Sequence, residues 1–223
     1  MIMDPLIRSA GFAALVIFAA FLMHNLNAAY IEPRYLGFTS YADYALLAKL
    51  ENASRALPWL LSGLGHVLSG FAMVILALGI YAMFREVRPI EAHIAICAGL
   101  LAATGFLLLG MSHVIGRQTL FLLTDANPAM RDSAYMTATV VRILFNGLAQ
   151  VGLGGFAVAL SWCSLKTRTL PRSFAFYGLV SGGAGLLMAF VYVPIYLFTV
   201  LFWALWLGVL LLRRPAQQVV APE

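Results

Sequence analysis

Charged side chains are scarce in this sequence. Only 10% of its 223 residues are Asp, Glu, Lys or Arg, whereas a soluble globular domain carries about 25%. Hydrophobic residues make up 62% of the chain, and the mean hydropathy is +0.91. So few charges exclude an ordinary water-facing surface and leave no room for a separate soluble domain. We therefore expect an integral membrane protein.

The apolar runs also lack the alternation of polar and apolar residues that a membrane β-strand requires. A helix needs about 20 apolar residues to cross a bilayer, and several runs reach this length. The sequence predicts an all-α, integral membrane bundle of six transmembrane helices that forms one polytopic domain over residues 1–223. The predicted spans are about 5–30, 58–84, 92–116, 133–163, 172–190 and 194–212. We expect the first span to be a retained helix and not a cleaved signal peptide.

Cysteine and catalytic motifs are equally sparse. The two cysteines, Cys97 and Cys163, are expected near the cytoplasmic ends of their helices as buried, inert thiols. The sequence has no nucleophile elbow, no His-Glu-x-x-His motif and no P-loop. Enzymatic activity is therefore less favoured than binding.

The net charge of +5 does not indicate nucleic-acid binding, because Lys and Arg set the orientation of a membrane protein. With both termini inside, the inner segments hold Arg8, Arg85, Arg88, Lys166, Arg168, Arg172, Arg213 and Arg214. The outer segments hold Arg34, Lys49, Arg55, Arg117 and Arg131. This bias favours cytoplasmic N and C termini. Trp59 and Trp162 then fall at opposite membrane boundaries, as residues of aromatic belts do.

Two long outer loops are expected. Residues 31–57 contain Ser40 and Asp43 at the start of a short amphipathic segment, which predicts a helix on the outer membrane surface or a solvated connector. The second loop, residues 117–132, contains Asn127-Pro128, a turn signal.

One predicted span carries polar side chains. Arg142, Asn146 and Gln150 are spaced four residues apart and therefore share one helical face. A charged guanidinium within a span costs about 2.5–3.5 kcal/mol on insertion scales, so it normally faces a bundle interior or a wet cavity.

Three of the four histidines fall at the depth of Arg142 when the spans are aligned at about 1.5 Å per residue. His24, His66 and His113 each lie near the outer end of a different span. Asn25, Asn27, Ser62 and Ser112 lie nearby in sequence, whereas His93 is expected at the inner interface. The sequence therefore predicts an outward-facing polar pocket.

Several occupants of this pocket remain open. Arg142 suits a small anionic or amphipathic ligand, such as a lipid headgroup. His66 and His113 could be axial ligands of a b-type haem, with Gly65, Gly70 and Gly110 leaving room for the macrocycle and the protein serving as an electron-transfer subunit. Three imidazoles also match the ligand count of a metal-dependent intramembrane enzyme. Alternatively, the polar residues hold the helices together and Arg142 reaches the surface.

Three features of the sequence carry a resemblance: the expected outer helix Tyr41–Ser54 before the second span, Leu170-Pro171-Arg172 before the fifth span with Gly178 after it, and the ending Leu207-Gly208-Val209-Leu210-Leu211-Leu212-Arg213-Arg214. On these features the region from Pro58 to Arg214 resembles an uncharacterised family of small six-helix bacterial membrane proteins. It implies six helices in a bacterial inner membrane and no assigned activity. The expected partners are the lipid bilayer and a lipid or small anion, with an oligomer or a larger membrane complex as alternatives.

Overall fold

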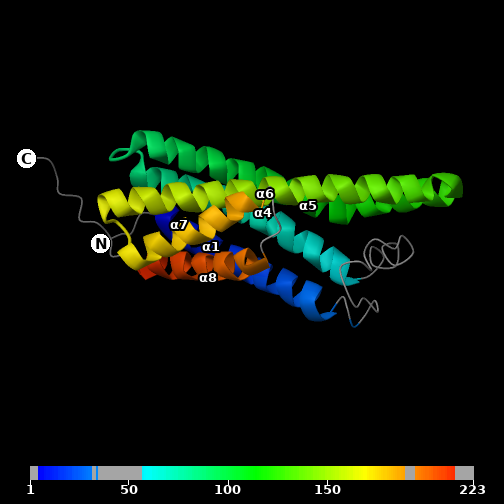
Figure 1. The fold of residues 1–223 in the computed structure, drawn as a ribbon, viewed down its shortest axis with the longest axis horizontal. Coiled ribbons are helices and arrows are strands. Elements are labelled where there is room, and N and C mark those ends of the chain that lie inside the picture. The colour runs from blue at the N-terminus through cyan, green and yellow to red at the C-terminus, as the bar shows by residue number, and fades with distance from the viewer. Residues whose placement is uncertain (1–4, 32–33, 35–56, 189–193, 214–223) are drawn as a thin grey trace, which may run out of the picture.

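The computed structural model describes residues 5–31, 34, 57–188 and 194–213, and this part of the chain consists of helices joined by short turns, without strands. The described residues form six α-helices, which run along the long axis of the molecule in Figure 1. They are α1 (Pro5–Leu26), α4 (Leu57–Phe84), α5 (Pro89–Ala126), α6 (Arg131–Thr167), α7 (Arg172–Leu187) and α8 (Pro194–Arg213). A π-helical turn, η1 (Asn27–Ile31), extends α1, and a short 3₁₀ helix, η3 (Pro128–Met130), joins α5 to α6. The all-α prediction is confirmed.

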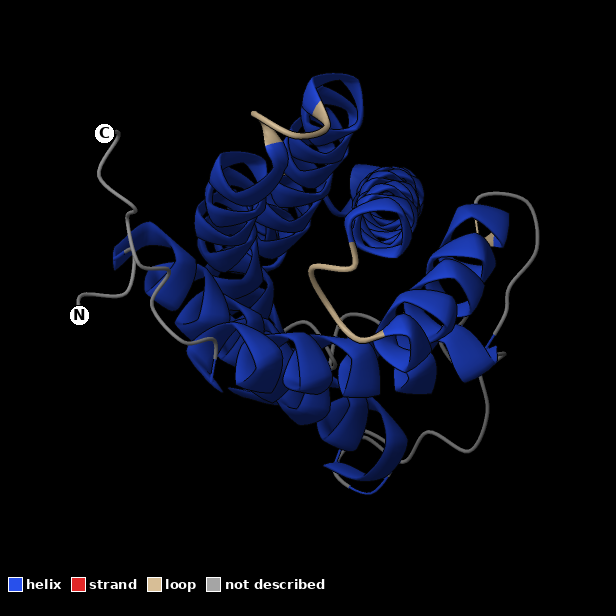
Figure 2. Ribbon diagram, turned by 90° about the vertical axis from the view of Figure 1, so that its left-hand side faces the viewer, coloured by secondary structure: helices blue, strands red, loops and turns tan. Residues whose placement is uncertain are grey.

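Each helix packs mainly against its neighbours in the chain, and the last helix returns to the first. α1 contacts α4, α4 contacts α5, α5 contacts α6, and α6 contacts α7. α8 packs against both α1 and α7, so the helices form a ring, which Figure 2 shows in end view. The shared interior contains large buried side chains such as Met73, Phe106, Phe156 and Trp203. Phe156 meets Trp203 edge to face at a centroid distance of 6.1 Å.

Small residues allow close approach between neighbouring helices. A Cβ on Gly105 of α5 would lie 2.6 Å from the Cα of Ala149 on α6. A Cβ on Gly154 of α6 would lie 2.7 Å from the carbonyl oxygen of Gly182 on α7. Because any larger side chain at these points would meet backbone atoms, glycine is needed for the observed helix spacing.

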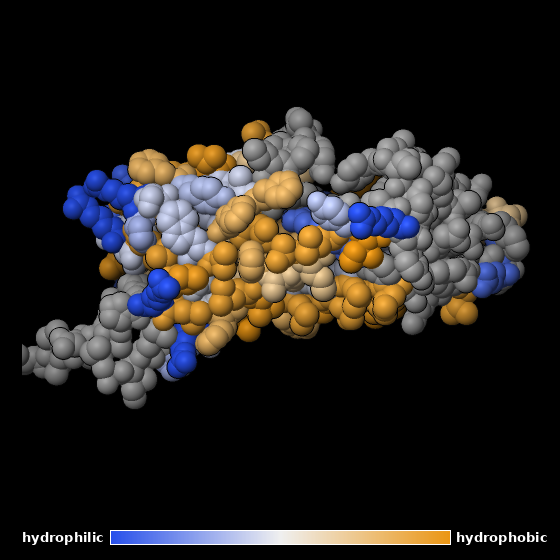
Figure 3. Space-filling view, turned by 90° about the horizontal axis from the view of Figure 1, so that it is seen from below, coloured by the Kyte–Doolittle hydropathy of each residue, from blue (hydrophilic) through white to orange (hydrophobic). Residues whose placement is uncertain are grey.

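Four described helical segments are long and apolar enough to cross a membrane: Pro5–Leu26, Trp59–Phe84, Pro89–Gly116 and Met136–Thr167. Phe198–Arg213 forms a shorter apolar helix. Figure 3 shows a hydrophobic surface over the middle of the molecule and hydrophilic residues at the end that carries the N terminus. Large hydrophobic side chains such as Phe71, Phe198 and Phe202 are exposed. These features are those of a membrane protein.

The expected outer loop over residues 117–132 is wrong. α5 continues to Ala126 and α6 begins at Arg131, so only the turn around η3 interrupts the helical hairpin. Arg117 marks the end of an apolar run, but a charge that ends a membrane span does not end a helix. No glycine or proline lies between Gly116 and Pro128, and the chain reverses at the predicted Asn127-Pro128 signal.

Three smaller expectations have different outcomes. Cys163 is buried, but Cys97 is exposed, so the expectation of two buried thiols is wrong for Cys97. His93 is exposed near the start of α5, where its ring nitrogens contact the Pro89 carbonyl oxygen at 2.6 Å and the Tyr81 hydroxyl at 3.2 Å. The predicted surface helix within residues 31–57 falls almost entirely outside the described residues.

Candidate binding site around Trp59 and Arg142

Three imidazole rings from three helices lie against one another. The centroids of His24 on α1 and His66 on α4 are 4.7 Å apart, and those of His66 and His113 on α5 are 5.7 Å apart. Phe106, one heptad before His113 on α5, lies nearly parallel to His66 at 6.3 Å. The structure thus brings together the three histidines that the sequence placed at a common depth.

The packing of α4 against α5 explains this meeting. A Cβ on Gly63 would lie 2.6 Å from the Cβ of His113, and one on Gly110 would lie 2.7 Å from the carbonyl oxygen of Gly63. The two glycines therefore allow the helix backbones to approach closely. His66 and His113 are consequently only 7% and 8% exposed.

Trp59 connects the histidines to Arg142. Its ring centroid lies 4.7 Å from that of His113, and the Cζ atom of Arg142 lies 4.2 Å from the centroid of Trp59. This is the geometry of a cation–π contact, which is strongest with tryptophan. One partner of the intramembrane guanidinium is therefore the face of an indole.

The burial of Trp59 corrects its assignment to an aromatic belt. The residue is 6% exposed, because it packs between α5 and α6 and does not face the membrane boundary. Its position on α4 carried a signal that the sequence analysis missed. Trp59, Ser62 and His66 are spaced i, i+3 and i+7 and so share one face. Phe106 was missed for a different reason, since a phenylalanine within an apolar span has no distinguishing pattern.

Three hydrogen bonds organise the polar side chains of the site. Asn27 donates from Nδ2 to Ser62 Oγ at 2.7 Å, which ties the start of η1 to α4. His113 donates from Nδ1 to the carbonyl oxygen of Leu109 at 2.8 Å. Gln150 donates from Nε2 to Asn146 Oδ1 at 3.2 Å. The bond between Asn146 and Gln150 stays within α6, so it extends the polar face inward from Arg142.

Other buried polar atoms in this region have no hydrogen-bond partner within the described part of the chain. They are His24 Nδ1, Asn25 Nδ2 and Gln150 Oε1. A buried donor or acceptor left unpaired costs about 1–3 kcal/mol, and such groups normally bind water, an ion or a ligand. These atoms lie on α1, which carries His24, and on α6, which carries Arg142.

The glycines do not leave space for a haem. A Cβ on Gly65 would lie 2.9 Å from Met23 Cε, and one on Gly70 would lie 2.6 Å from Leu107 Cγ. A Cβ on Gly110 would meet Val67 Cγ2 at 2.6 Å. Side chains of α1, α4 and α5 thus occupy the positions that the macrocycle needed, and the three glycines are explained by helix packing.

The convergence of imidazoles does not form a metal-binding group either. Among the described residues, no set of three or more His, Cys, Asp or Glu side chains has an arrangement that could hold a metal ion. The arrangement is instead a packed row of aromatic and imidazole rings that ends in a guanidinium. Its chemistry is that of a largely buried polar cluster with one permanent positive charge.

No protein family, curated protein or solved structure matches this chain.

Proposed function

We propose that this chain is a multi-pass membrane protein that binds a small anionic or amphipathic ligand at a site centred on Arg142. The site faces the outer side of a bacterial inner membrane. In this proposal all six α-helices are membrane-embedded, and both termini lie in the cytoplasm.

The observation that carries the proposal is the stacking of Arg142 on buried Trp59. A guanidinium that stacks on an indole keeps its N–H donors in the plane of the group, at its edge. Those donors match the oxygens of a carboxylate or phosphate, which they can bind in pairs. The contact with the neutral indole of Trp59 does not neutralise the charge of Arg142. The site therefore still attracts anions.

The unpaired polar atoms support a binding role over a purely structural one. Asn27 and Ser62 are bonded to each other, but His24 Nδ1, Asn25 Nδ2 and Gln150 Oε1 have no partner among the described residues. Within that part of the chain, Ser161, Tyr196 and Trp203 in the core also leave a polar atom unpaired, so the proposal combines these atoms with the charge of Arg142. A ligand that carries hydroxyl groups beside its anionic oxygens would donate to Gln150 Oε1 and accept from Asn25 Nδ2.

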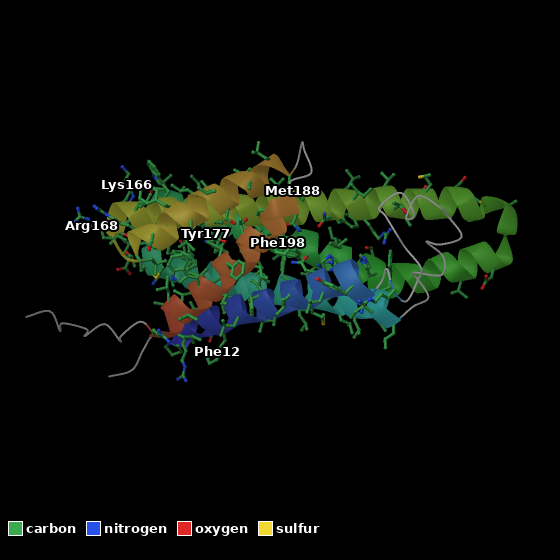
Figure 4. All side chains as sticks on the ribbon, turned by 60° about the horizontal axis from the view of Figure 1, so that its bottom comes forward. Phe12, Lys166, Arg168, Tyr177, Met188 and Phe198 are labelled. Atoms are coloured by element: carbon green, nitrogen blue, oxygen red, sulfur yellow. The ribbon has the colours of Figure 1, made fainter. Side chains whose placement is uncertain are left out.

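The distribution of basic residues supports the proposed orientation. Arg85 and Arg88 follow α4, and Lys166 and Arg168 end α6, all at the end of the bundle where α1 begins and α8 finishes. Figure 4 shows Lys166 and Arg168 at this end. Because positively charged loops stay in the cytoplasm, this end is the inner one and Arg142 lies toward the outer side.

The shorter helices support six embedded segments. α7 has 16 residues and α8 has 20, which correspond to about 24 and 30 Å at about 1.5 Å per residue. α8 packs along α1, and Phe198 and Phe202 face outward from it. We therefore place the α7–α8 hairpin within the bilayer.

Removing the Arg142 charge tests the proposal. Purified protein in detergent is heated with and without phosphatidylglycerol, which is anionic, or phosphatidylcholine, which is zwitterionic. Phosphatidylglycerol should raise the Tm of the wild type, since a ligand that binds the native state stabilises it. Arg142→Ala should lose most of this increase.

The matched control is Arg172→Ala, which removes the same charge from an exposed position at the start of α7. It should keep the increase in Tm. An equal loss in both variants would show that general surface charge attracts the lipid, and the proposed site would be wrong.

A further inference from the structure

α7 covers only part of the α6 face that it packs against. Gly147, Gly154 and Ser161 are spaced seven residues apart and so lie along one face of α6. A Cβ on Gly154 would meet the backbone of Gly182 and Leu186 on α7, and Ser161 contacts the position of a Cβ on Gly178. A Cβ on Gly147 would meet nothing within 4 Å.

The end of α7 explains this difference. α7 finishes at Leu187 and is followed by Met188, whereas α6 continues outward beyond both. Figure 4 shows Met188 partway along the bundle, with the α5–α6 hairpin extending past it. Outward of Gly147 on the same side of α6, Ile143 is 64% exposed and Val140 is 50% exposed. We call Val140, Ile143 and Gly147 the open face of α6.

The open face borders Arg142, Asn146 and Gln150 on α6, which we call the polar stripe. Ile143 lies three residues before Asn146, and Gly147 lies three residues before Gln150, so each is adjacent to a polar residue on the helix surface. The open face also falls within the apolar segment Met136–Thr167. Acyl chains of the bilayer would therefore contact this face, next to Asn146 and Gln150 on the surface of α6.

Charge decides which occupant fits. Within α6 after Asp132, and in α7 and α8, the sequence contains no Asp or Glu. A second copy of these apolar helices would cover the open face but would bring no anion from them to Arg142. An anionic lipid supplies both a negative headgroup and an acyl chain.

We propose that the ligand of the Arg142 site is an anionic phospholipid that reaches it sideways from the bilayer across the open face of α6. The headgroup phosphate lies at Arg142, and one acyl chain runs along Ile143 and Gly147. The inference rests on the proposed function, because it names the ligand class and the access route for the same site.

A bulky side chain at Gly147 tests the route. Gly147→Phe is compared with Gly183→Phe, because Gly183 on α7 also has nothing within 4 Å of an added Cβ and lies away from the polar stripe. The probes are dioleoylphosphatidylglycerol and the soluble headgroup analogue sn-glycerol 3-phosphate. A well-occupied site should raise the Tm of the wild type by about 5 °C.

The inference predicts that Gly183→Phe keeps the Tm increase given by dioleoylphosphatidylglycerol and that Gly147→Phe loses at least half of it. Both variants should respond equally to sn-glycerol 3-phosphate. If Gly147→Phe keeps the full lipid effect while Arg142→Ala abolishes it, the sideways route is wrong and the proposed function stands. If Arg142→Ala changes neither response, both proposals fail.

A wild-type measurement covers the case in which Gly147→Phe does not fold. Phosphatidylglycerol with a photoreactive diazirine on its acyl chain should label the segment from Val140 to Val151 more than the exposed Val180 region of α7. Equal labelling of the two regions would reflect ordinary lipid contact and overturn the inference. Formation of a dimer that shields Val140–Val151 from the label would also overturn it, because a second copy would then cover the open face.

Discussion

The cost of placing Arg142 within a membrane span determines how its neighbours must be arranged. Insertion scales set this cost at about 2.5–3.5 kcal/mol, and a cation–π contact returns about 0.5–2 kcal/mol, more as it is desolvated. Trp59, whose ring centroid lies 4.2 Å from the guanidinium carbon of half-buried Arg142, therefore offsets part of the cost. The remainder must come from other interactions of the guanidinium, and an anionic ligand would contribute to them.

A double-mutant cycle measures the contact between Trp59 and Arg142. The single variants Trp59→Leu and Arg142→Gln are compared with the double variant by the free energy of unfolding in mixed detergent micelles. We expect a coupling of about 0.5–2 kcal/mol, because Trp59 is buried and Arg142 is half-buried. A coupling below about 0.3 kcal/mol would show that the two side chains do not stabilise each other.

The sequence predicted part of this arrangement and missed its centre. The spacing of Arg142, Asn146 and Gln150 places them on one face, and depth counting brings the histidines to one level. Trp59 was misplaced because a tryptophan at the end of a span is typical of an aromatic belt. Only the tertiary packing of α4 on α5, through Gly63 and Gly110, places it between His113 and Arg142.

At the scale of elements, the glycines of α6 differ in how closely neighbouring helices approach them. A Cβ on Gly152 would lie 2.7 Å from the Cα of Ala102 and 2.9 Å from the carbonyl oxygen of Ala98. Because these are backbone atoms of α5, the helices would have to separate to accommodate it. Gly147, five residues earlier, meets nothing, so an added methyl group there displaces no neighbour.

Alanine substitutions at these two glycines should therefore have opposite effects. Gly152→Ala should lower the free energy of unfolding by about 1–3 kcal/mol, as overpacking does. Gly147→Ala should raise it by up to about 1 kcal/mol, because alanine favours the helix. Equal effects in the same denaturation assay would contradict the helix contacts described for α6.

The helix boundaries show what an apolar pattern can and cannot predict. Pro58 and Pro194 lie at or next to helix starts, as expected for a residue without an N–H donor. α5 and α6 extend well beyond their predicted spans because hydropathy reports the membrane boundary and not the last hydrogen-bonded turn. α5 has 38 residues, or about 57 Å at about 1.5 Å per residue, against a hydrocarbon core of about 30 Å.

At the scale of the molecule, the proposed orientation places the α5–α6 turn outside and the α4–α5 turn inside. In a variant without Cys97 and Cys163, single cysteines at Asp125 and Val87 test this arrangement, since both positions are exposed. An impermeant maleimide added to intact spheroplasts should label the cysteine at position 125 and leave the one at position 87 unlabelled. The reverse labelling would invert the topology and place Arg142 toward the cytoplasm.

The most direct test of the account is an experimental density map of the protein in nanodiscs that contain phosphatidylglycerol. The account predicts non-protein density that contacts the Arg142 guanidinium while its face remains on Trp59, and that continues along the open face of α6. A map in which protein atoms alone surround the guanidinium, or in which Arg142 points away from Trp59, would contradict the account.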